Sequence, residues 1–326
     1  MFTFLQTGST DAAYNLAFEE VVLTCKRTGD FLLLWQNRNA VVLGKNQNVF
    51  EEVDLTAAEK FGITVVRRIT GGGAVYHDLG NINFSLIRDA KEPVDFEEEL
   101  KPVTGALHRM GIPVEVSGRN DILLDGKKIS GTAKCIRDGR LLFHGTLLFD
   151  SDLELLSDVL RVDPEKLRSK SIRSVKSRVT NIREHYYKEL DTEGFYRLLA
   201  DAFAADGLCP GSLSPEELSE VERLRNNKYA SRAWTVGDVP EPDVLRRKRW
   251  DGGLLEVFVY LDRDTIRDIR FFGDYLSTRD CSEVSALLAG CPFEPEEISA
   301  RLEGVCLQDY FDTITKEQFL DTVFGR

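Results

Sequence analysis

A pair of arginines and a run of three glycines lie close together in the sequence, and this combination suits the binding of an anion. Arg67 and Arg68 end a strand-like segment, and Gly71–Gly73 follow after two intervening residues. Glycine lacks a Cβ atom, so its backbone N–H can approach an anion closely, and a guanidinium can hold two phosphate or carboxylate oxygens at once. The cluster predicts a phosphate or carboxylate site. A flexible hairpin flanked by solvated arginines remains the structural alternative.

A second cluster surrounds a lysine on a predicted hairpin strand. Lys128 precedes Ile129 and the small residues Ser130 and Gly131. Small neighbours leave room for a ligand, and a lysine supplies a compact positive charge for phosphate. Taken alone, this segment is more typical of an exposed hairpin lysine than of a ligand site. His144, further along the chain, is likewise more often structural than functional when seen in isolation.

The familiar nucleotide-binding motifs are absent from the sequence. It contains no GxxxxGK[ST] phosphate loop and no GxGxxG after a predicted strand. If the protein uses ATP, it must bind the nucleotide with a different architecture. The six cysteines show neither CxxC nor zinc-type spacing, so we expect buried, reduced thiols.

Composition narrows the class of protein. The 326 residues allow one large domain and a smaller one, and 42% hydrophobic with 29% charged residues is ordinary for a globular protein. A net charge of −12 argues against general nucleic-acid binding. No apolar run suits a membrane span, and the first residues lack the features of a secretory signal. We therefore expect a cytoplasmic protein that binds neither nucleic acid nor membrane.

The elements that must position the two clusters follow from turn signals and periodicity. Asp125-Gly126 and Asp138-Gly139, each between strand-like residues, predict an antiparallel meander over residues 112–149. Asp11 is a candidate helix N-cap. The remaining predictions are helices at 51–61, 97–110, within 152–227, at 281–289 and 295–302; strands at 31–35, 40–43, 63–68, 74–77, 82–87, 253–261 and 265–271; and a linker at 234–250. The pattern indicates an α+β protein with domains at residues 1–245 and 246–326.

In their order along the chain, the clusters resemble the lipoate–protein ligase family. The resemblance covers nearly the whole chain, and the ordered spacing makes it specific. The matching segments are Tyr14-Asn15-Leu16-Ala17-x-Glu-Glu, Arg67-Arg68-x-Thr-Gly-Gly-Gly-Ala-Val-Tyr-His-Asp, Asn81-x-Asn-Phe, Ser117-Gly118-Arg119-Asn120-Asp121, Lys128-Ile129-Ser130-Gly131, His144-Gly145-Thr146, Ser174–Asn181 and Gly252–Val257.

The resemblance implies a fold, substrates and partners. The fold is a catalytic domain like that of biotin ligases and class II aminoacyl-tRNA synthetases, with a mixed, largely antiparallel sheet, followed by a small α/β C-terminal domain. The substrates are lipoate and ATP with Mg²⁺. The acceptors are apo lipoyl domains of 2-oxoacid dehydrogenase E2 subunits and the glycine cleavage H protein, and the chain is expected to act as a monomer.

The same resemblance implies a set of site residues. Lys128 is the expected catalytic residue, touching both the lipoate carboxylate and the α-phosphate, and Asp121 is a candidate Mg²⁺ ligand. Those expected to contact ATP or the adenylate are Arg68, Gly71, Gly72, Gly73, Ala74, Val75, Tyr76 and Lys128. Further expected pocket residues are Arg67, His77, Asn120, Asp121, His144 and Arg178.

Two more features of the site are expected from the residues around it. The strand segments 32–35 and 41–43 are candidates for lining an apolar slot for the dithiolane and its alkyl chain. The basic segment 161–178 is a candidate cover for the adenylate and a steering surface for an acidic partner. Departures from close relatives at Thr70, Lys170-Ser171 and Lys176 leave the details of loop closure open.

Three alternatives remain open at this point. A transferase of the same fold would use a cysteine thioester, yet residues 111–127 contain no cysteine and Cys135 lies after Lys128. A biotin ligase would usually show a Gly-Arg-Gly-Arg-x-Gly-Arg loop. An inactive module that only binds lipoyl domains would keep the fold. The intact Lys128 and the intact glycine loop argue against the loss of catalytic residues expected of such a module.

Overall fold

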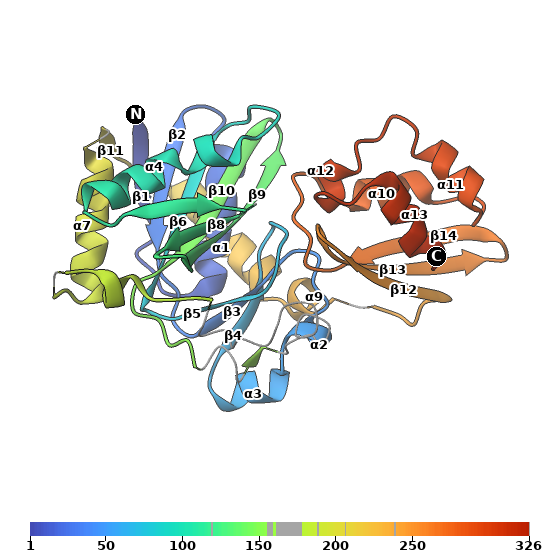
Figure 1. Ribbon diagram of the computed structural model, residues 1–326, viewed down its shortest axis with the longest axis horizontal. Coiled ribbons are helices and arrows are strands. Elements are labelled where there is room, and N and C mark those ends of the chain that lie inside the picture. The colour runs from blue at the N-terminus through green and yellow to red at the C-terminus, as the bar shows by residue number, and fades with distance from the viewer. Residues whose placement is uncertain are drawn as a thin grey trace.

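The computed structural model describes residues 1–118, 120–154, 159–160, 178–187, 189–205, 207–237 and 239–325. Figure 1 shows a larger N-terminal unit, blue to yellow, beside a smaller C-terminal unit, orange to red. The predicted basic cover at 161–178 lies outside the described residues except for Arg178. No helix among the described residues is long and apolar enough to cross a membrane.

An eight-stranded sheet forms the centre of the N-terminal unit, in the order β11-β1-β2-β6-β10-β9-β8-β7. Among the described residues, the pairings of β1 with β11 and with β2 are parallel, and every other pairing in this sheet is antiparallel. The mixed, largely antiparallel α+β fold and the 112–149 meander are therefore confirmed. The strands are β1 (Phe2–Gln6), β2 (Asp30–Trp35), β6 (Asn81–Asp89), β7 (Val114–Ser117), β8 (Asp121–Leu124), β9 (Lys127–Arg137), β10 (Arg140–Leu148) and β11 (Leu208–Pro210).

Helices cover both faces of this sheet. They are α4 (Phe96–Arg109) and α7 (Thr192–Ala204) on one face, and α1 (Ala12–Cys25), with α8 (Pro215–Leu224) packed against it, on the other. Because successive strand side chains point to opposite faces, Leu32 of β2 joins the first core and Leu33 joins the second. Asp11 caps α1 as predicted, since its carboxylate accepts from the N–H groups of Ala13 and Tyr14.

A small three-stranded sheet carries the arginine–glycine cluster. It consists of β4 (Thr64–Arg67), β3 (Ala40–Leu43) and β5 (Val75–His77), with β3 in the middle. The strands predicted at 31–35 and 40–43 exist, but they belong to different sheets. The helix predicted at 51–61 is wrong as one element, because Asp54 caps a new helix there. The two helices are α2 (Val49–Glu52) and α3 (Leu55–Lys60).

The C-terminal unit is an antiparallel sheet covered by helices on one face (Figure 1). Its strands are β12 (Val244–Trp250), β13 (Gly253–Asp262) and β14 (Thr265–Phe272), and its helices are α10 (Ser282–Leu288), α11 (Pro295–Arg301), α12 (Gln308–Phe311) and α13 (Lys316–Phe324). The predicted linker at 234–250 is wrong over its last seven residues, which pair with β13. A charged edge strand is easily taken for a loop, since edge strands often carry lysine and arginine.

In the described part of the chain, three short irregular helices complete the N-terminal unit, and the last two precede the C-terminal unit in the sequence. They are a 3₁₀ turn η2 (Ile182–His185), a π-helical turn η3 (Arg225–Tyr229) that continues α8, and α9 (Arg232–Thr235). All six cysteines are free, as predicted, but Cys25, Cys209 and Cys306 are exposed. The prediction that all six are buried is therefore wrong.

Candidate active site

Two cavities meet at Lys128. The small cavity has a volume of about 160 Å³ and lies between the main sheet and the small sheet. The large cavity, of about 480 Å³, extends toward Tyr76 and Arg178. The five residues that line both cavities are Ala74, Val75, Lys128, Gly131 and Thr146. Lys128 is the only cation among these five, so a molecule in either cavity could contact its ammonium group.

The strand β9 is distorted where it presents Lys128. Ile122 pairs with Ser130 and Leu123 pairs with Lys128, so Ile129 is an extra residue in the ladder. Such a bulge re-aims neighbouring side chains and is common beside active sites. A Cβ atom on Gly131 would lie 3.0 Å from Lys128 Nζ, so the glycine leaves the space that the lysine side chain occupies.

Lys128 combines a fixed backbone with a partly exposed side chain. Its N–H donates to Arg178 O at 2.8 Å, and Thr180 N–H donates to Lys128 O at 3.1 Å. The ammonium lies 2.6 Å from Asp121 Oδ1, and about a third of each side chain is exposed. This single, solvent-accessible ion pair leaves the lysine able to donate to an incoming anion.

Arg68 is fully engaged inside the glycine loop. Its guanidinium donates to Val42 O at 3.1 Å, Gly71 O at 2.6 Å and Gly73 O at 2.9 Å, and its Nε donates to Thr70 Oγ1 at 2.9 Å. Burial lowers the pKa of Arg68 to about 10, which still leaves it charged at neutral pH. Arg68 therefore holds the loop in shape from within.

Arg67 is also directed away from the cavities. Among the described residues, its guanidinium donates only to backbone carbonyls, and burial lowers its pKa to about 10. It joins the loop after β3 to α9 across the base of the glycine loop. The acceptors are the carbonyl oxygens of Gly44, Lys45, Gln47, Trp234 and Thr235.

A buried polar chain connects the arginine–glycine cluster to α1. Thr70 Oγ1 lies 2.8 Å from His144 Nε2, and His144 Nδ1 lies 2.8 Å from Glu19 Oε1. Ser85 also donates to Glu19 Oε1, at 2.6 Å. Arg68 donates to the same Thr70. This series of hydrogen bonds therefore fixes the positions of the glycine loop, His144 and the cavity wall relative to each other.

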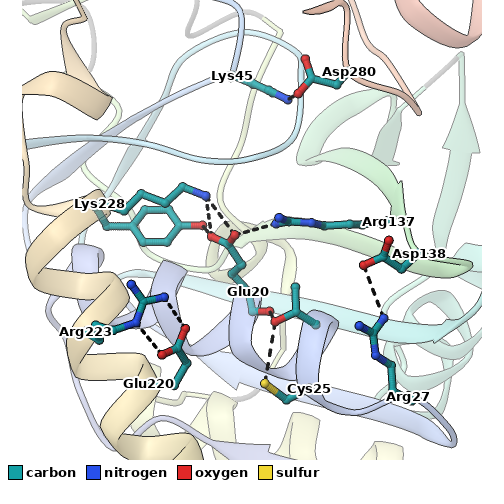
Figure 2. A network of polar contacts seen from close by, with 12 residues as sticks. Glu20, Cys25, Arg27, Lys45, Arg137, Asp138, Glu220, Arg223, Lys228 and Asp280 are labelled. Atoms are coloured by element: carbon teal, nitrogen blue, oxygen red, sulfur yellow. Dashed lines mark hydrogen bonds and ion pairs between the residues drawn. The ribbon is translucent and has the colours of Figure 1, made fainter. Parts of the chain in front are cut away.

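The C-terminal unit packs directly on the glycine loop. Gly72 N–H donates to Tyr275 O at 3.0 Å, and a Cβ atom on Gly71 would lie 2.8 Å from the same oxygen. An ion pair joins Lys45 to Asp280 beside this contact (Figure 2). A Cβ on Gly73 would meet nothing within 4 Å, so Gly73 is the most open of the three glycines.

A second buried network ties α1 to β9 and η3, as Figure 2 shows. The Glu20 carboxylate accepts from Lys228 at 2.7 Å, Tyr229 at 2.6 Å and Arg137 at 2.7 Å. Burial alone would raise the pKa of Glu20, but Lys228 and the other donors hold it below its ordinary value. This network braces the elements behind the site without reaching either cavity.

Most of the expected site residues line the two cavities. Arg67 and Gly71 line neither. In the small cavity lie Arg68, Gly72, Gly73, Ala74, Val75, His77, Asn120, Lys128 and His144; in the large one lie Ala74, Val75, Tyr76, Asp121, Lys128 and Arg178. Of the strand segments expected to line an apolar slot, Trp35 and Val42 line the small cavity.

Other lining residues were not anticipated. Leu16 and Asn83 belong to segments that carry the family resemblance, yet only the fold shows that they reach the small cavity. Asp152, Leu153 and Leu160 line the large cavity from a segment without any recognisable motif. For that segment, the sequence offers no signal.

Two other chemistries, a cysteine thioester and a resident metal centre, depend on side chains outside the arginine–glycine cluster. Cys135 lines neither cavity, and burial, with Glu19 nearby, raises the pKa of its thiol to about 12. A thiol with so high a pKa is a poor nucleophile. Among the described residues, no group of three or more His, Cys, Asp or Glu side chains is arranged to hold a metal ion.

Comparisons with known proteins show the family of this chain. The model of the lipoyl protein ligase A/B catalytic domain matches residues 11–204, and that of the bacterial lipoate protein ligase C-terminus matches residues 239–323. Lipoate-protein ligase LplJ of Bacillus subtilis is 39% identical, over 96% of this chain and 97% of its own. P. falciparum LipL1, solved in complex with lipoate, has a similar fold, with a TM-score of 0.81, 22% identity, and coverage of 100% of this chain and 98% of its own. A lipoate-protein ligase A bound with ATP superposes with a TM-score of 0.60 at 26% identity, covering 73% of this chain and 97% of its own.

Proposed function

The chain belongs to the lipoate–protein ligase family, and on that premise we propose that it activates lipoate with ATP and transfers the lipoyl group to a lysine of a lipoyl domain. The observation that carries the proposal is the meeting of two cavities at one lysine. A ligase that joins a carboxylate to the α-phosphate of ATP needs two adjoining sites with a cation at their junction.

The two cavities differ in volume, about 160 Å³ against about 480 Å³, which suits substrates of different size. Leu16, Trp35 and Val42 line the small cavity, which suits an alkyl chain ending in a ring. The large cavity has room for a nucleotide, and Tyr76 and Arg178 are among its walls. With the acid in the small cavity and ATP in the large one, the carboxylate and the α-phosphate meet beside Lys128.

The first half-reaction forms an acyl adenylate. A carboxylate oxygen attacks the α-phosphorus, the new acyl–phosphate bond forms, and pyrophosphate leaves with the electron pair of the broken P–O bond. The two anions repel, and negative charge builds on the phosphate oxygens in the transition state. Lys128 offsets this repulsion by donating hydrogen bonds to both substrates, an effect typically worth about 2.7–4 kcal/mol.

Asp121 contributes to this step in two ways. Its carboxylate, 2.6 Å from Lys128 Nζ, orients the ammonium toward the junction of the cavities. One carboxylate beside a triphosphate site also fits Mg²⁺, which usually binds one or two carboxylates together with substrate phosphates. When bound with ATP, the ion would supply neutralising charge for pyrophosphate.

The second half-reaction transfers the acyl group. The neutral amine of the acceptor lysine attacks the acyl carbon, AMP leaves with the electrons of the acyl–oxygen bond, and the new amide loses a proton. Because the adenylate is already activated, the protein contributes mainly by positioning and by excluding water. The acceptors that the family resemblance implies are lipoyl domains of E2 subunits and the glycine cleavage H protein.

The proposal is tested by the intact mass of an apo lipoyl domain. Incubation with this protein, lipoate and Mg-ATP should add one lipoyl mass, and omission of ATP should abolish the addition. An ATP analogue with a methylene bridge between the α- and β-phosphorus is the matched control, because its pyrophosphate analogue cannot leave. Transfer from a lipoylated or octanoylated donor without ATP would instead establish a transferase.

A further inference from the structure

His77 has a buried ring nitrogen without a partner in the wall of the small cavity. Only 3% of the residue is exposed, and it lines the small cavity but not the large one. Its Nε2 has no hydrogen-bond partner among the described residues. Buried polar atoms are normally satisfied, so an unpartnered one beside a ligand cavity points to a contact with the ligand.

A chain of amides determines which nitrogen of His77 carries the proton. Asn15 Nδ2 lies 3.1 Å from Ser9 O and 2.8 Å from Gln36 O, which fixes it as a donor. Asn15 Nδ2 also lies 2.9 Å from Asn37, so its two hydrogens are shared among three acceptors; the Asn37 atom that faces this donor is Oδ1, and the other amide atom of Asn37 is a donor. Asn37 Nδ2 lies 3.0 Å from His77 Nδ1, which must then accept.

The neutral imidazole therefore holds its proton on Nε2. Burial, together with the nearby charges of Arg68 and His144, lowers the pKa of His77 to about 3. The ring is therefore neutral at neutral pH. His77 thus presents one N–H donor at that pH.

The position of His77 along β5 places this donor near the far end of the acyl chain. Val75 lines both cavities at the Lys128 junction, and His77 lies two residues further along the same face of the strand. Two strand residues span roughly 6–7 Å. The Trp35 ring is 6.3 Å from the His77 ring in an edge-to-face arrangement, so an aromatic surface flanks the donor.

We propose that the Nε2–H of His77 recognises a sulfur of the dithiolane ring and so selects lipoate over acids with an all-carbon tail. Divalent sulfur is a weak hydrogen-bond acceptor, and it also packs favourably beside an aromatic ring such as Trp35. A hydrocarbon tail would leave the N–H without a partner, and that carries a cost. The inference rests on the proposed function, because it assigns the tail of the acid to the small cavity.

The test pairs a change in the protein with a matched change in the substrate. 5-Cyclopentylpentanoate has the shape of lipoate with methylene groups in place of both sulfurs. Pyrophosphate release is measured with each acid for the wild type, His77→Phe, which lacks a donor, and His77→Gln, which keeps an N–H. We expect the wild type to prefer lipoate in kcat/KM by about three- to tenfold, the range for one neutral hydrogen bond.

The variants separate recognition from support of the fold. In His77→Phe, the ratio of kcat/KM for lipoate to that for 5-cyclopentylpentanoate should fall close to one. In His77→Gln, most of the preference for lipoate should remain. If His77→Phe lowers kcat/KM equally with both acids, the preference for lipoate is unchanged. His77 would then have a structural role, and the inference would be wrong. If His77→Phe does not fold, equal kcat/KM for the two acids in the wild type overturns it as well. Failure of the wild type to activate either acid would instead contradict the proposed function.

Discussion

The two sides of the junction use positive charge in opposite ways. On the small-sheet side, Arg67 and Arg68 are buried, and within the described part of the chain their side chains donate to backbone carbonyls and to Thr70. On the main-sheet side, Lys128 is a third exposed and has one carboxylate partner. The arginines shape the glycine loop, whereas the lysine side chain is accessible from both cavities. Charge near a cavity is therefore not evidence of contact with the ligand until its partners are known.

The largest expected effect on stability comes from the arginine side. Arg67→Met should lower the free energy of unfolding by roughly 3 kcal/mol or more, because each buried carbonyl left unsatisfied costs about 1–3 kcal/mol. Urea denaturation measures the change. The control is Arg223→Met, which removes an exposed arginine paired with Glu220 on α8 and should leave the transition almost unchanged. If the urea midpoint of Arg67→Met equals that of the wild type, Arg67 does not stabilise the fold. The contrast between the buried arginines and the accessible Lys128 would then be wrong.

A smaller effect is expected behind the site, at Glu20. Its pKa is below the ordinary value in the folded protein, so the charged form contributes stability above pH 4.5 or so, and this is lost as the pH falls through the folded-state value. Glu20→Gln should therefore destabilise at pH 7 by roughly 1.5–3 kcal/mol, the range for hydrogen bonds to a charged group. The difference between variant and wild type should shrink below that pH. A difference that is constant with pH would show that the charge of Glu20 is irrelevant.

The smallest effect is expected at Cys135, which shares β9 with Lys128. Its thiol has a pKa of about 12 and lines neither cavity, so Cys135→Ala should retain lipoyl transfer within about threefold of the wild type. Acceptor modification followed by mass spectrometry checks this. Loss of transfer in a folded Cys135→Ala protein would restore the thioester mechanism.

Local signals in the sequence predicted much of the fold. The two Asp-Gly turns adopt positive φ at both residues, and strands flank them as predicted. Long-range placement was not predictable in the same way. The strands ending at Trp35 and beginning at Ala40 look like a hairpin, but tertiary packing assigns them to separate sheets.

The site shows the same division between local and long-range information. Residue type and order identified Lys128, the glycine loop and His144. They did not show that Arg67 faces away from the cavities, because its acceptors come from segments about 20 and 170 residues away in the chain. Nor did they reveal the tautomer of His77, which depends on Asn15 and Asn37. Such features depend on contacts between distant segments, and a motif does not encode them.

The most direct test of the account is the rate of pyrophosphate release, with lipoate and Mg-ATP, in two neighbouring lysine variants. Lys128→Ala should be slower by about 10²–10³, the loss typical when a transition-state donor is removed. Lys127→Ala changes the adjacent lysine on the same strand, which lines neither of the two cavities, and should keep the wild-type rate. A folded Lys128→Ala protein that forms the adenylate as fast as the wild type would contradict the central role given to this residue.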